Sequence, residues 1–501
     1  MTSTLMEVDS APVSEVQTKD HTNVDKFVDL LRQVSKTTTT LDSRYVWKSL
    51  RELPGWRKEL NQHTLSILIT LIYPDDSSFK VPLLKVVNQN LKSNVENAES
   101  FRSKYPADFY QLTNAGKVDV SAELNSFIHL FVQLYLLDSE QVVELEAFNL
   151  QTVVPRVLQY YNNRTLDLIN AKLWFYIART HELLGNSRDY TIRNEMMKFL
   201  RTATLKYDNE SKAMLITLII RDLLNSGEVE TASDFISKVE FPSDHDVSSP
   251  LEARYYFYLS KINAIQLDYS AANDYVMAAI KKAPNSQSSL GFLQQANKLH
   301  CVIQLLMGDI PELSFFHQKG MEETLTPYYH LSKAVKLGDL KKFTATISRY
   351  KPQLVQDGNY QLCVRLRSNV IKTGIRIISL TYKKISLKDI CLRLHLDSEQ
   401  TVEYMVSRAI RDGVIEAKIN HQEGYIETSE LLNVYATKQP QHIFDDRIIF
   451  VNQLHDECVV AMRYPGSREK KKNAKSDNQE GELDLDVMDL SDYGSDIEDL
   501  I

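Results

Sequence analysis

Apolar residues recur at helical spacing along most of the chain, from about residue 23 to Phe444. In the middle of the chain the pattern repeats as a helix with one apolar face, a turn and a second helix. Four such turns align: Asn225–Phe235, Gln266–Tyr275, Leu306–Phe316 and Lys336–Thr346. Repeats of this kind predict a solenoid of helical hairpins, whose units bury their apolar faces against their neighbours. A single irregular all-helical globule is the alternative.

The turns carry the residues that end one helix and begin the next. Three of them place a glycine directly before an acid. Glycine can adopt the left-handed conformation that closes a helix, and an acid can accept backbone N–H groups at the start of the following one. The acids expected in this role are Glu228, a weaker capping residue, and Asp268, Asp309 and Asp339. Their separations of 40, 41 and 30 residues are too irregular for a strict tetratricopeptide array.

Strand-like alternation is clear only near Lys384–Ser429, which reads as helix, turn, helix and two short strands joined by a tight turn. This order predicts a winged helix, a shape that often binds DNA through its second helix. That helix, Ser398–Asp412, carries three acids against two arginines, and its first half carries Glu399 and Glu403 without a base. Since phosphate neutralisation supplies most non-specific DNA affinity, this charge pattern favours a protein-facing role.

One stretch argues the other way. Residues Asn359–Ile385 contain no acid and six cations: Arg365, Arg367, Lys372, Arg376, Lys383 and Lys384. Such a stretch can be a solvated or internally paired face, a docking surface for an acidic protein, or a nucleic-acid surface. Charge alone leaves the three open, and we predict that Arg365, Arg367 and Arg376 bind a protein partner.

The formal net charge of −8 is unevenly distributed. The segment from Ser476 to Ile501 holds ten acids and no Lys or Arg, so the remaining chain has 58 bases against 56 acids. A segment so rich in like charge and poor in apolar residues is expected to be disordered. The body of the protein is therefore nearly neutral, and the acidity belongs to its end.

The sequence proposes no reaction, cofactor or metal. A phosphate-binding G-x-x-x-x-G-K-[ST] loop, an H-E-x-x-H pair and a G-x-S-x-G elbow are all missing. The four cysteines lie far apart, which disfavours zinc pairs and suits a reducing compartment. The longest apolar run, Phe127–Leu137, is too short to span a bilayer. Because the first residues lack a secretory pattern, we expect a protein of the nucleus and cytoplasm. Because these catalytic motifs are missing, we expect that the protein is not an enzyme.

A helix is predicted over Gln441–Tyr464, between Pro440 and Pro465. Its apolar positions form a coiled-coil-like seam with spacings of four and three: Phe444, Ile448, Val451, His455, Cys458 and Met462. Other apolar residues, among them Leu454, fall off that seam, so the apolar surface wraps much of the helix. Such a helix belongs inside a bundle whose other walls come from other chains. Packing against its own winged helix is the alternative.

These patterns divide the chain into five parts. We predict a disordered arm over residues 1–22, a helical solenoid over 23–249 and a domain of hairpins plus winged helix over 250–433. The winged helix itself occupies about residues 360–429. The C-terminal helix follows over 441–464, and a disordered basic linker and acidic tail over 466–501.

Solenoid hairpins that lead into a winged helix and then one more helix resemble the PCI-domain proteins. The resemblance covers about residues 35–465 and is carried by long blocks such as "PLEARYYFYLSKINAIQLDYSAAN" (Pro250–Asn273), "NKLHCVIQLLMGDIPELSFFHQ" (Asn297–Gln318) and "NQLHDECVVAMRYP" (Asn452–Pro465). It is closest to the PCI subunits of the proteasome lid and implies a mostly α fold, with a right-handed, TPR-like solenoid before the winged-helix module.

The resemblance also implies a function and partners. PCI subunits are scaffolds that pair edge to edge through their winged helices and gather their C-terminal helices into a shared bundle. The expected partners are lid subunits seven and twelve and a small acidic lid subunit, with no nucleic acid and no membrane. The partner-binding residues expected on the wing are Ile415, Ile419, Tyr425 and Ile426. A PCI scaffold of an mRNA export or translation initiation complex, associated with nucleic acid, is the alternative function.

Overall fold

The fold was analysed in a computed structural model of the whole chain. The structure describes residues 13–73, 77–87, 120–185, 190–242, 247–284, 286–318, 320–396, 398–429, 435 and 437–462. The chain divides into two compact units, residues 1–414 and 415–501, and each is described by itself. Most of the described residues are helical, as predicted. No helix in these ranges is both long enough and apolar enough to cross a bilayer.

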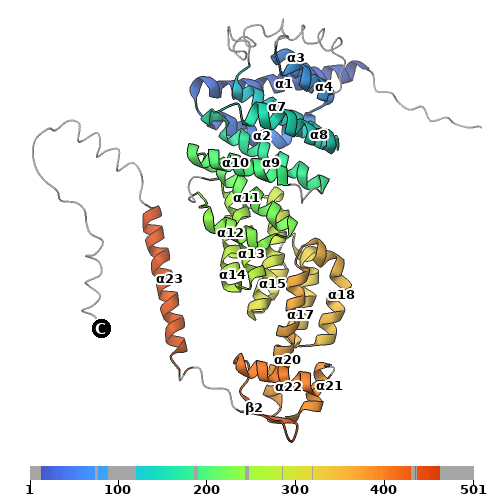
Figure 1. Cartoon of the computed structure of the whole chain (residues 1–501), viewed down its shortest axis with the longest axis vertical. Coiled ribbons are helices and arrows are strands. Elements are labelled where there is room, and N and C mark those ends of the chain that lie inside the picture. The colour runs from blue at the N-terminus through green and yellow to red at the C-terminus, as the bar shows by residue number, and fades with distance from the viewer. Residues whose placement is uncertain are drawn as a thin grey trace, which may run out of the picture. The chain divides into compact units, whose positions relative to one another are not determined.

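The first unit is built from helices that follow one another as antiparallel neighbours (Figure 1). Its elements are α1 (Val13–Thr40), α2 (Arg44–Glu59), α3 (Gln62–Ile72), α4 (Lys80–Val86), α7 (Ala122–Asp138), α8 (Val142–Phe148), the wide helical segment η1 (Asn149–Leu158), the short turn η2 (Arg164–Leu166), α9 (Asp167–Leu184), α10 (Tyr190–Lys206), α11 (Asn209–Ser226), α12 (Val229–Lys238), α13 (Ser249–Gln266), α14 (Tyr269–Lys282), η3 (Gln287–Ser289), α15 (Leu290–Met307), α16 (Leu313–Phe316), α17 (Glu322–Leu337), α18 (Leu340–Gln356), α19 (Tyr360–Arg365), α20 (Arg367–Thr381), β1 (Lys384–Ser386), α21 (Leu387–Leu394) and α22 (Glu399–Arg411).

The capping prediction holds at two of the four turns. The Asp268 carboxylate accepts the Ala271 N–H at 3.3 Å, and the Asp339 carboxylate accepts the Lys342 N–H at 3.1 Å. Glu228 precedes α12 without a side-chain capping bond. Asp309 begins no helix, because Pro311 offers no N–H to cap and disfavours helical backbone at the residue before it. The short α16 begins at Leu313 instead.

The helix ends at these turns are closed by left-handed residues. The three glycines have positive φ, as predicted. In the fourth turn Leu267 takes the same role with φ 78°, although its side chain disfavours that conformation. Local chain geometry therefore overrides residue preference at this position.

The N-terminal helix starts earlier than predicted. α1 begins at Val13, so residues 13–22 of the predicted disordered arm are helical, and residues 1–12 lie outside the described part of the chain. The segment has no glycine or proline after Pro12, so nothing in it stops the helix from extending backwards from its apolar face. That face begins with Val24 and Phe27, which are fully buried.

The winged-helix elements match the prediction closely. In the first unit, Ser386 caps α21 and Ser398 caps α22, each accepting the N–H of the residue three positions later. In the second unit, β2 (Ala417–Asn420) and β3 (Tyr425–Thr428) form the predicted antiparallel hairpin. Ile419 lies opposite Ile426, and Asn420 lies opposite Tyr425.

The C-terminal helix α23 (Gln439–Ala461) begins two residues before the predicted start. Pro440 does not bracket the helix but lies in its first turn, where the missing N–H of proline costs nothing. Met462 follows the last helical residue. The predicted end of the helix at Tyr464, the bracketing Pro465, and the basic linker and acidic tail lie outside the described residues.

Two glycines bring the solenoid against α20. A Cβ atom added to Gly338, which ends α17 with φ 63°, would lie 2.6 Å from the Cα atom of Gly374 in α20. A Cβ atom added to Gly374 would lie 3.0 Å from the Gly338 carbonyl oxygen and 2.6 Å from the Leu394 side chain. The two backbones therefore touch at a point that no larger residue fits.

Replacing Gly338 by alanine should cost about 2–5 kcal/mol of unfolding free energy, the sum of left-handed strain and overpacking. Gly185 is the matched control, because it has φ 71° and nothing within 4 Å of the added Cβ atom. Gly185→Ala should therefore cost only the strain, about 1–2 kcal/mol. Denaturant unfolding of both variants measures the difference, and equal losses would show that the contact at Gly374 does not matter.

His129 in α7 is a second test of the core. Its Nδ1 lies 2.8 Å from the Asn125 carbonyl oxygen, and the rings of Phe79 and Phe148 lie on either side, at centroid distances of 5.7 and 5.8 Å. Its Nε2 atom is buried with no hydrogen-bond partner among the described residues. Burial penalises the imidazolium and lowers the pKa of His129 to about 4.

Because the folded pKa of His129 lies below the unfolded value of 6.5, the unfolded state binds the proton more readily. Stability is retained above pH 6.5 and should fall by about 3 kcal/mol as the pH falls from 6.5 to 4, at about 1.4 kcal/mol per pKa unit. In His129→Leu this part of the acid dependence should disappear, whereas the exposed His455→Leu should keep it. Unfolding free energies measured from pH 4 to 8 give the difference. Parallel pH profiles for the three proteins would contradict the assignment.

Candidate interaction surfaces

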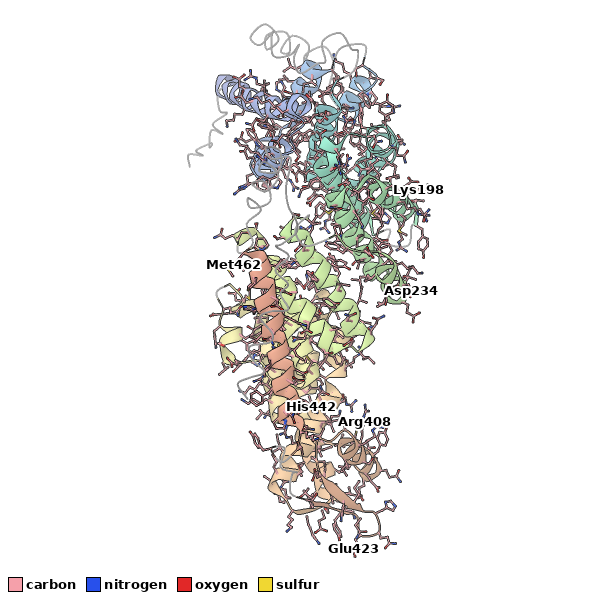
Figure 2. The ribbon with its side chains drawn as sticks, turned by 90° about the vertical axis from the view of Figure 1, so that its left-hand side faces the viewer. Lys198, Asp234, Arg408, Glu423, His442 and Met462 are labelled. Carbon is pink, nitrogen blue, oxygen red and sulfur yellow. The ribbon has the colours of Figure 1, made fainter. Side chains whose placement is uncertain are left out.

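The C-terminal helix presents an exposed apolar surface in the described part of the chain. All six partner-binding residues predicted for the C-terminal helix are exposed: Phe444, Ile448, Val451, Leu454 and Cys458 on α23, and Met462 directly after it. The Phe444 side chain is 62 % exposed, and Phe450, which falls off the predicted seam, is equally exposed. Figure 2 marks His442 and Met462 near the two ends of this helix. None of its residues is buried, so the predicted wrapping of apolar side chains around the helix is present and uncovered.

The wing behaves differently from the prediction. Ile415 and Ile426 are only 3 % and 2 % exposed, so their side chains belong to the core and cannot contact a partner. Ile419 and Tyr425 are half-buried. Alternating side chains point to opposite faces of a strand, and Ile419 covers the same face as Ile426, its cross-strand neighbour. What β2 can offer a partner is its backbone, because this strand stands at an edge of the sheet.

The cations of the basic stretch have unlike roles. Arg365 is half-buried, and its guanidinium donates to the carbonyl oxygens of Ala264 and Ile265 at 3.3 and 3.2 Å, at the end of α13. Lys372 forms a 2.7 Å ion pair with Asp412, and this hydrogen bond holds the pKa of Asp412 below its usual value. Arg367 and Arg376 are exposed. The internally paired interpretation therefore applies to Arg365 and Lys372, and of the three arginines predicted to bind a partner, Arg367 and Arg376 remain open for docking.

Two further positions in this region were not predicted from the sequence. Asn369 donates to the Leu305 and Leu306 carbonyl oxygens at 3.1 and 3.0 Å, at the end of α15. Its position four residues after Arg365 is the signal that could have revealed it, because the two side chains share one helical side. Tyr404 on α22 is 63 % exposed and offers an aromatic contact on the helix that would face DNA in a DNA-binding winged helix.

The described residues bring no reactive centre together. They contain no group of three or more His, Cys, Asp or Glu side chains able to hold a metal ion. Cys301 and Cys363 are buried, which raises the pKa of the Cys363 thiol to about 12 and also raises that of Cys301. Both thiols stay protonated and unreactive.

Three family models match successive parts of the chain. A model of PSMD3-like N-terminal TPR repeats covers residues 19–332, a PCI domain model covers 347–430, and a model of the C-terminal region of a proteasome regulatory subunit, Rpn3, covers 433–499. The chain is 60 % identical to the 26S proteasome regulatory subunit RPN3 of Saccharomyces cerevisiae over 490 residues, which is 95 % of this chain and 94 % of the yeast protein. This chain belongs to the Rpn3/PSMD3 family of proteasome regulatory subunits.

More distant relatives agree over nearly the same length. The probable 26S proteasome regulatory subunit rpn3 of Schizosaccharomyces pombe is 38 % identical over 91 % of this chain and 90 % of its own. The probable 26S proteasome non-ATPase regulatory subunit 3 of Drosophila melanogaster is 35 % identical over 92 % of this chain and 90 % of its own. The resemblance to proteasomal PCI subunits is thereby confirmed, and an mRNA export or translation scaffold is not favoured.

Membership of this family bears on the organisation of the chain. The helical solenoid followed by a PCI module agrees with the first two family models. The PCI match begins at residue 347, whereas we placed the start of that domain at 250. The domain boundaries stay a prediction. The third model spans α23 and the acidic residues after it.

The substitution Arg365→Ala tests whether Arg365 stabilises the fold through its hydrogen bonds to the end of α13 or serves only to bind a partner. Loss of two charge-assisted hydrogen bonds at the end of α13 should lower the unfolding free energy by about 1.5–3 kcal/mol. Arg367→Ala removes a neighbouring exposed arginine and should change it by less than about 0.5 kcal/mol. Urea unfolding of the isolated chain compares them. If Arg365→Ala were as stable as Arg367→Ala, the contacts to Ala264 and Ile265 would contribute nothing to stability.

Proposed function

We propose that this chain is a non-catalytic scaffold subunit of the lid of the proteasome regulatory particle, and that it supports assembly and ubiquitin-dependent protein degradation. The observation that carries the proposal is α23, whose apolar residues are exposed around much of the helix in a chain of the Rpn3/PSMD3 family. An isolated chain would leave the apolar residues of such a helix in water. A subunit that shares a helical bundle with other chains can bury them.

The size of the apolar surface supports a strong association. Burying one large apolar side chain stabilises by about 1.5–3 kcal/mol. Five or six of the residues on α23 would contribute on the order of 10 kcal/mol before the costs of association and ordering are subtracted. That is enough for a helix to hold a subunit in a complex when the partner helices supply matching apolar faces.

The winged helix would contribute a second contact. The exposed edge of β2 can accept a strand from a neighbouring subunit through main-chain hydrogen bonds. Ile419 and Tyr425 would line that junction, whereas the buried Ile415 and Ile426 would support it from inside. Arg367 and Arg376 remain available for an acidic neighbour.

The expected neighbours follow from the resemblance to lid PCI subunits. They are lid subunits seven and twelve and the small acidic lid subunit, in a hetero-oligomer without nucleic acid or membrane. A role as a regulatory subunit that carries out no reaction itself fits the names of the relatives. We place the protein in the nucleus and the cytoplasm, where the particle would act.

Truncation tests the role of α23. Ending the chain after Asp445 removes the exposed apolar residues from Ile448 onward but leaves the first unit intact, so the first unit should melt as in the full chain. Incorporation into the particle should be lost because the bundle contact is gone. Ending the chain after Tyr464 removes only the residues beyond α23 and should leave incorporation unchanged.

Both truncations would be purified, melted alone and tested for co-purification with tagged lid subunits. If α23 packs on its own winged helix instead, the Asp445 truncation should melt at a lower temperature. Normal incorporation of that truncation would refute the bundle role.

A further inference from the structure

The helix α2 turns a basic and aromatic stripe outward. Trp47, Arg51, Pro54 and Lys58 are spaced by four, three and four residues, so they lie along one side of the helix, and all four are exposed. We call these four residues the α2 stripe. The opposite side of α2 is buried through Val46, Ser49 and Leu53.

Trp47 is unusual among the tryptophans of the chain. Trp174 is 1 % exposed, and Trp56 packs against Phe27 at a ring-centroid distance of 5.3 Å. Trp47 is 53 % exposed, with the Arg51 guanidinium 5.6 Å from its ring. Tryptophan and arginine are the residues that contribute most often to binding energy at protein interfaces.

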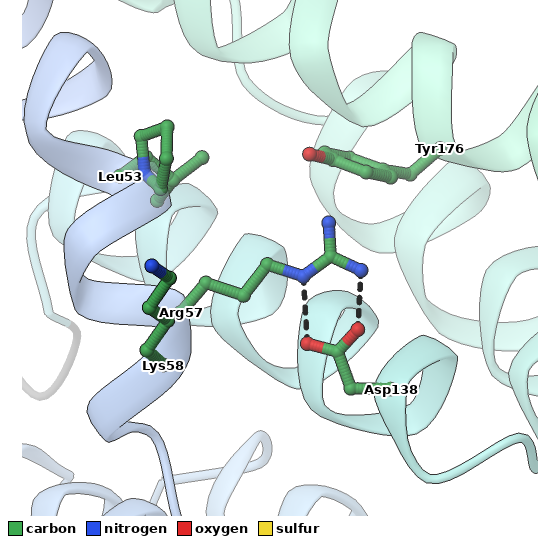
Figure 3. Close-up of a pocket in the computed structure, with 6 residues that line it drawn as sticks. Leu53, Arg57, Lys58, Asp138 and Tyr176 are labelled. Atoms are coloured by element: carbon green, nitrogen blue, oxygen red, sulfur yellow. Dashed lines mark hydrogen bonds and ion pairs between the residues drawn. The ribbon is translucent and has the colours of Figure 1, made fainter. Parts of the chain in front are cut away.

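A hollow of about 480 Å³ opens at the C-terminal end of the stripe. Leu53, Pro54 and Tyr176 supply its apolar lining, and Lys58 stands beside it (Figure 3). Arg57 also lines the hollow, but its charge is satisfied, because its guanidinium donates to both oxygens of Asp138, at 2.7 Å from Nε to Oδ2. The hollow can therefore take an apolar side chain with a cation at its rim.

The remaining cations of this side of α2 lack matching acids. Among the described residues, no carboxylate lies within 4 Å of Lys48, Arg51 or Lys58, and Glu59 is paired with Lys26 at 3.2 Å. Arg44 has Asp42 at 3.9 Å, and Glu52 is the one other acid of the helix. An uncompensated positive face next to an apolar hollow complements a segment that carries both carboxylates and an apolar side chain.

We propose that the α2 stripe binds an acidic protein segment contributed by another subunit of the assembled particle. One apolar side chain of that segment enters the hollow beside Tyr176, and its carboxylates face Arg51 and Lys58. A nucleic acid fits less well, because three uncompensated cations neutralise few phosphates and the hollow offers an apolar lining. The proposal rests on assembly of the chain into the regulatory particle.

A photoreactive p-benzoylphenylalanine in place of Trp47 tests this in the assembled particle. Full-length chain would be incorporated, irradiated and analysed by mass spectrometry. An adduct with a segment of another subunit that has more Asp and Glu than Lys and Arg is the expected result, and an adduct with residues 476–501 of this chain would contradict it. The same substitution at Val143, which is 71 % exposed on α8, is the control and should not label that segment.

Reversing the charges of Arg51 and Lys58 provides a second test. Adding Arg51→Glu and Lys58→Glu to the photoreactive chain should lower the adduct yield at least about tenfold, equivalent to 1.4 kcal/mol of binding, without changing the melting temperature. Lys238→Glu, at an exposed lysine of α12, should leave the yield unchanged. An adduct with nucleic acid, with a neutral or basic segment, or with nothing in a fully assembled particle would overturn the proposal for α2. A chain that fails to enter the particle even with native α2 would instead contradict the proposed function.

Discussion

The C-terminal ends of three solenoid helices, α13, α15 and α17, contact one short stretch of chain, Arg365–Gly374. The position of the winged-helix elements in the first unit depends on these contacts. The last carbonyl groups of a helix have no partner within it and carry partial negative charge. Arg365 satisfies those of α13 and Asn369 those of α15. At the end of α17 there is no room for a side chain, and the backbone of Gly374 lies directly against Gly338. Arg365 ends α19, whereas Asn369 and Gly374 lie on α20, so the stretch is held at three points and has little freedom of direction. It therefore fixes the position of α21 and α22, which pack on α20.

α23 shows the opposite arrangement. The solenoid buries its apolar faces, whereas α23 buries no residue, although its apolar content is high. Most of the stability of a protein helix comes from tertiary packing of its apolar face rather than from intrinsic propensity. A helix without such packing exposes surface that promotes association. The chain therefore contains one part that buries its apolar faces among the described residues and one part whose apolar surface is exposed.

Sequence patterns predicted the features that depend on neighbours in the chain. Helical periodicity identified the hairpins, and Asp268 and Asp339 were recognisable as caps because a cap acts within four residues. The prediction that Asp309 caps a helix was wrong for an equally local reason, because Pro311 follows two residues later. Features that depend on contacts between residues far apart in the chain could not be predicted from the sequence. Arg365 meets carbonyl groups about a hundred residues away in the chain, and nothing in its surroundings distinguishes it from the exposed Arg367. Leu267 adopts a left-handed conformation that its residue type disfavours, and Ile415 and Ile426 alternate like edge-strand residues but are buried.

The cations of the chain thus differ in whether their own chain supplies them with acceptor groups. Arg57 and Lys372 find carboxylates in their own chain, and Arg365 finds carbonyl groups. Arg51 and Lys58 find neither within the described residues, although they are on the same helix as Arg57. The body of the chain has nearly as many acids as bases, so these cations are unpaired among the described residues because of where the acids lie and not because acids are too few.

Interactions between exposed charges weaken beyond a Debye length of about 8 Å at physiological salt, whereas partly buried pairs are screened much less. If α2 binds an acidic segment as proposed, rising ionic strength should therefore weaken that binding before it loosens the contact between Arg365 and α13.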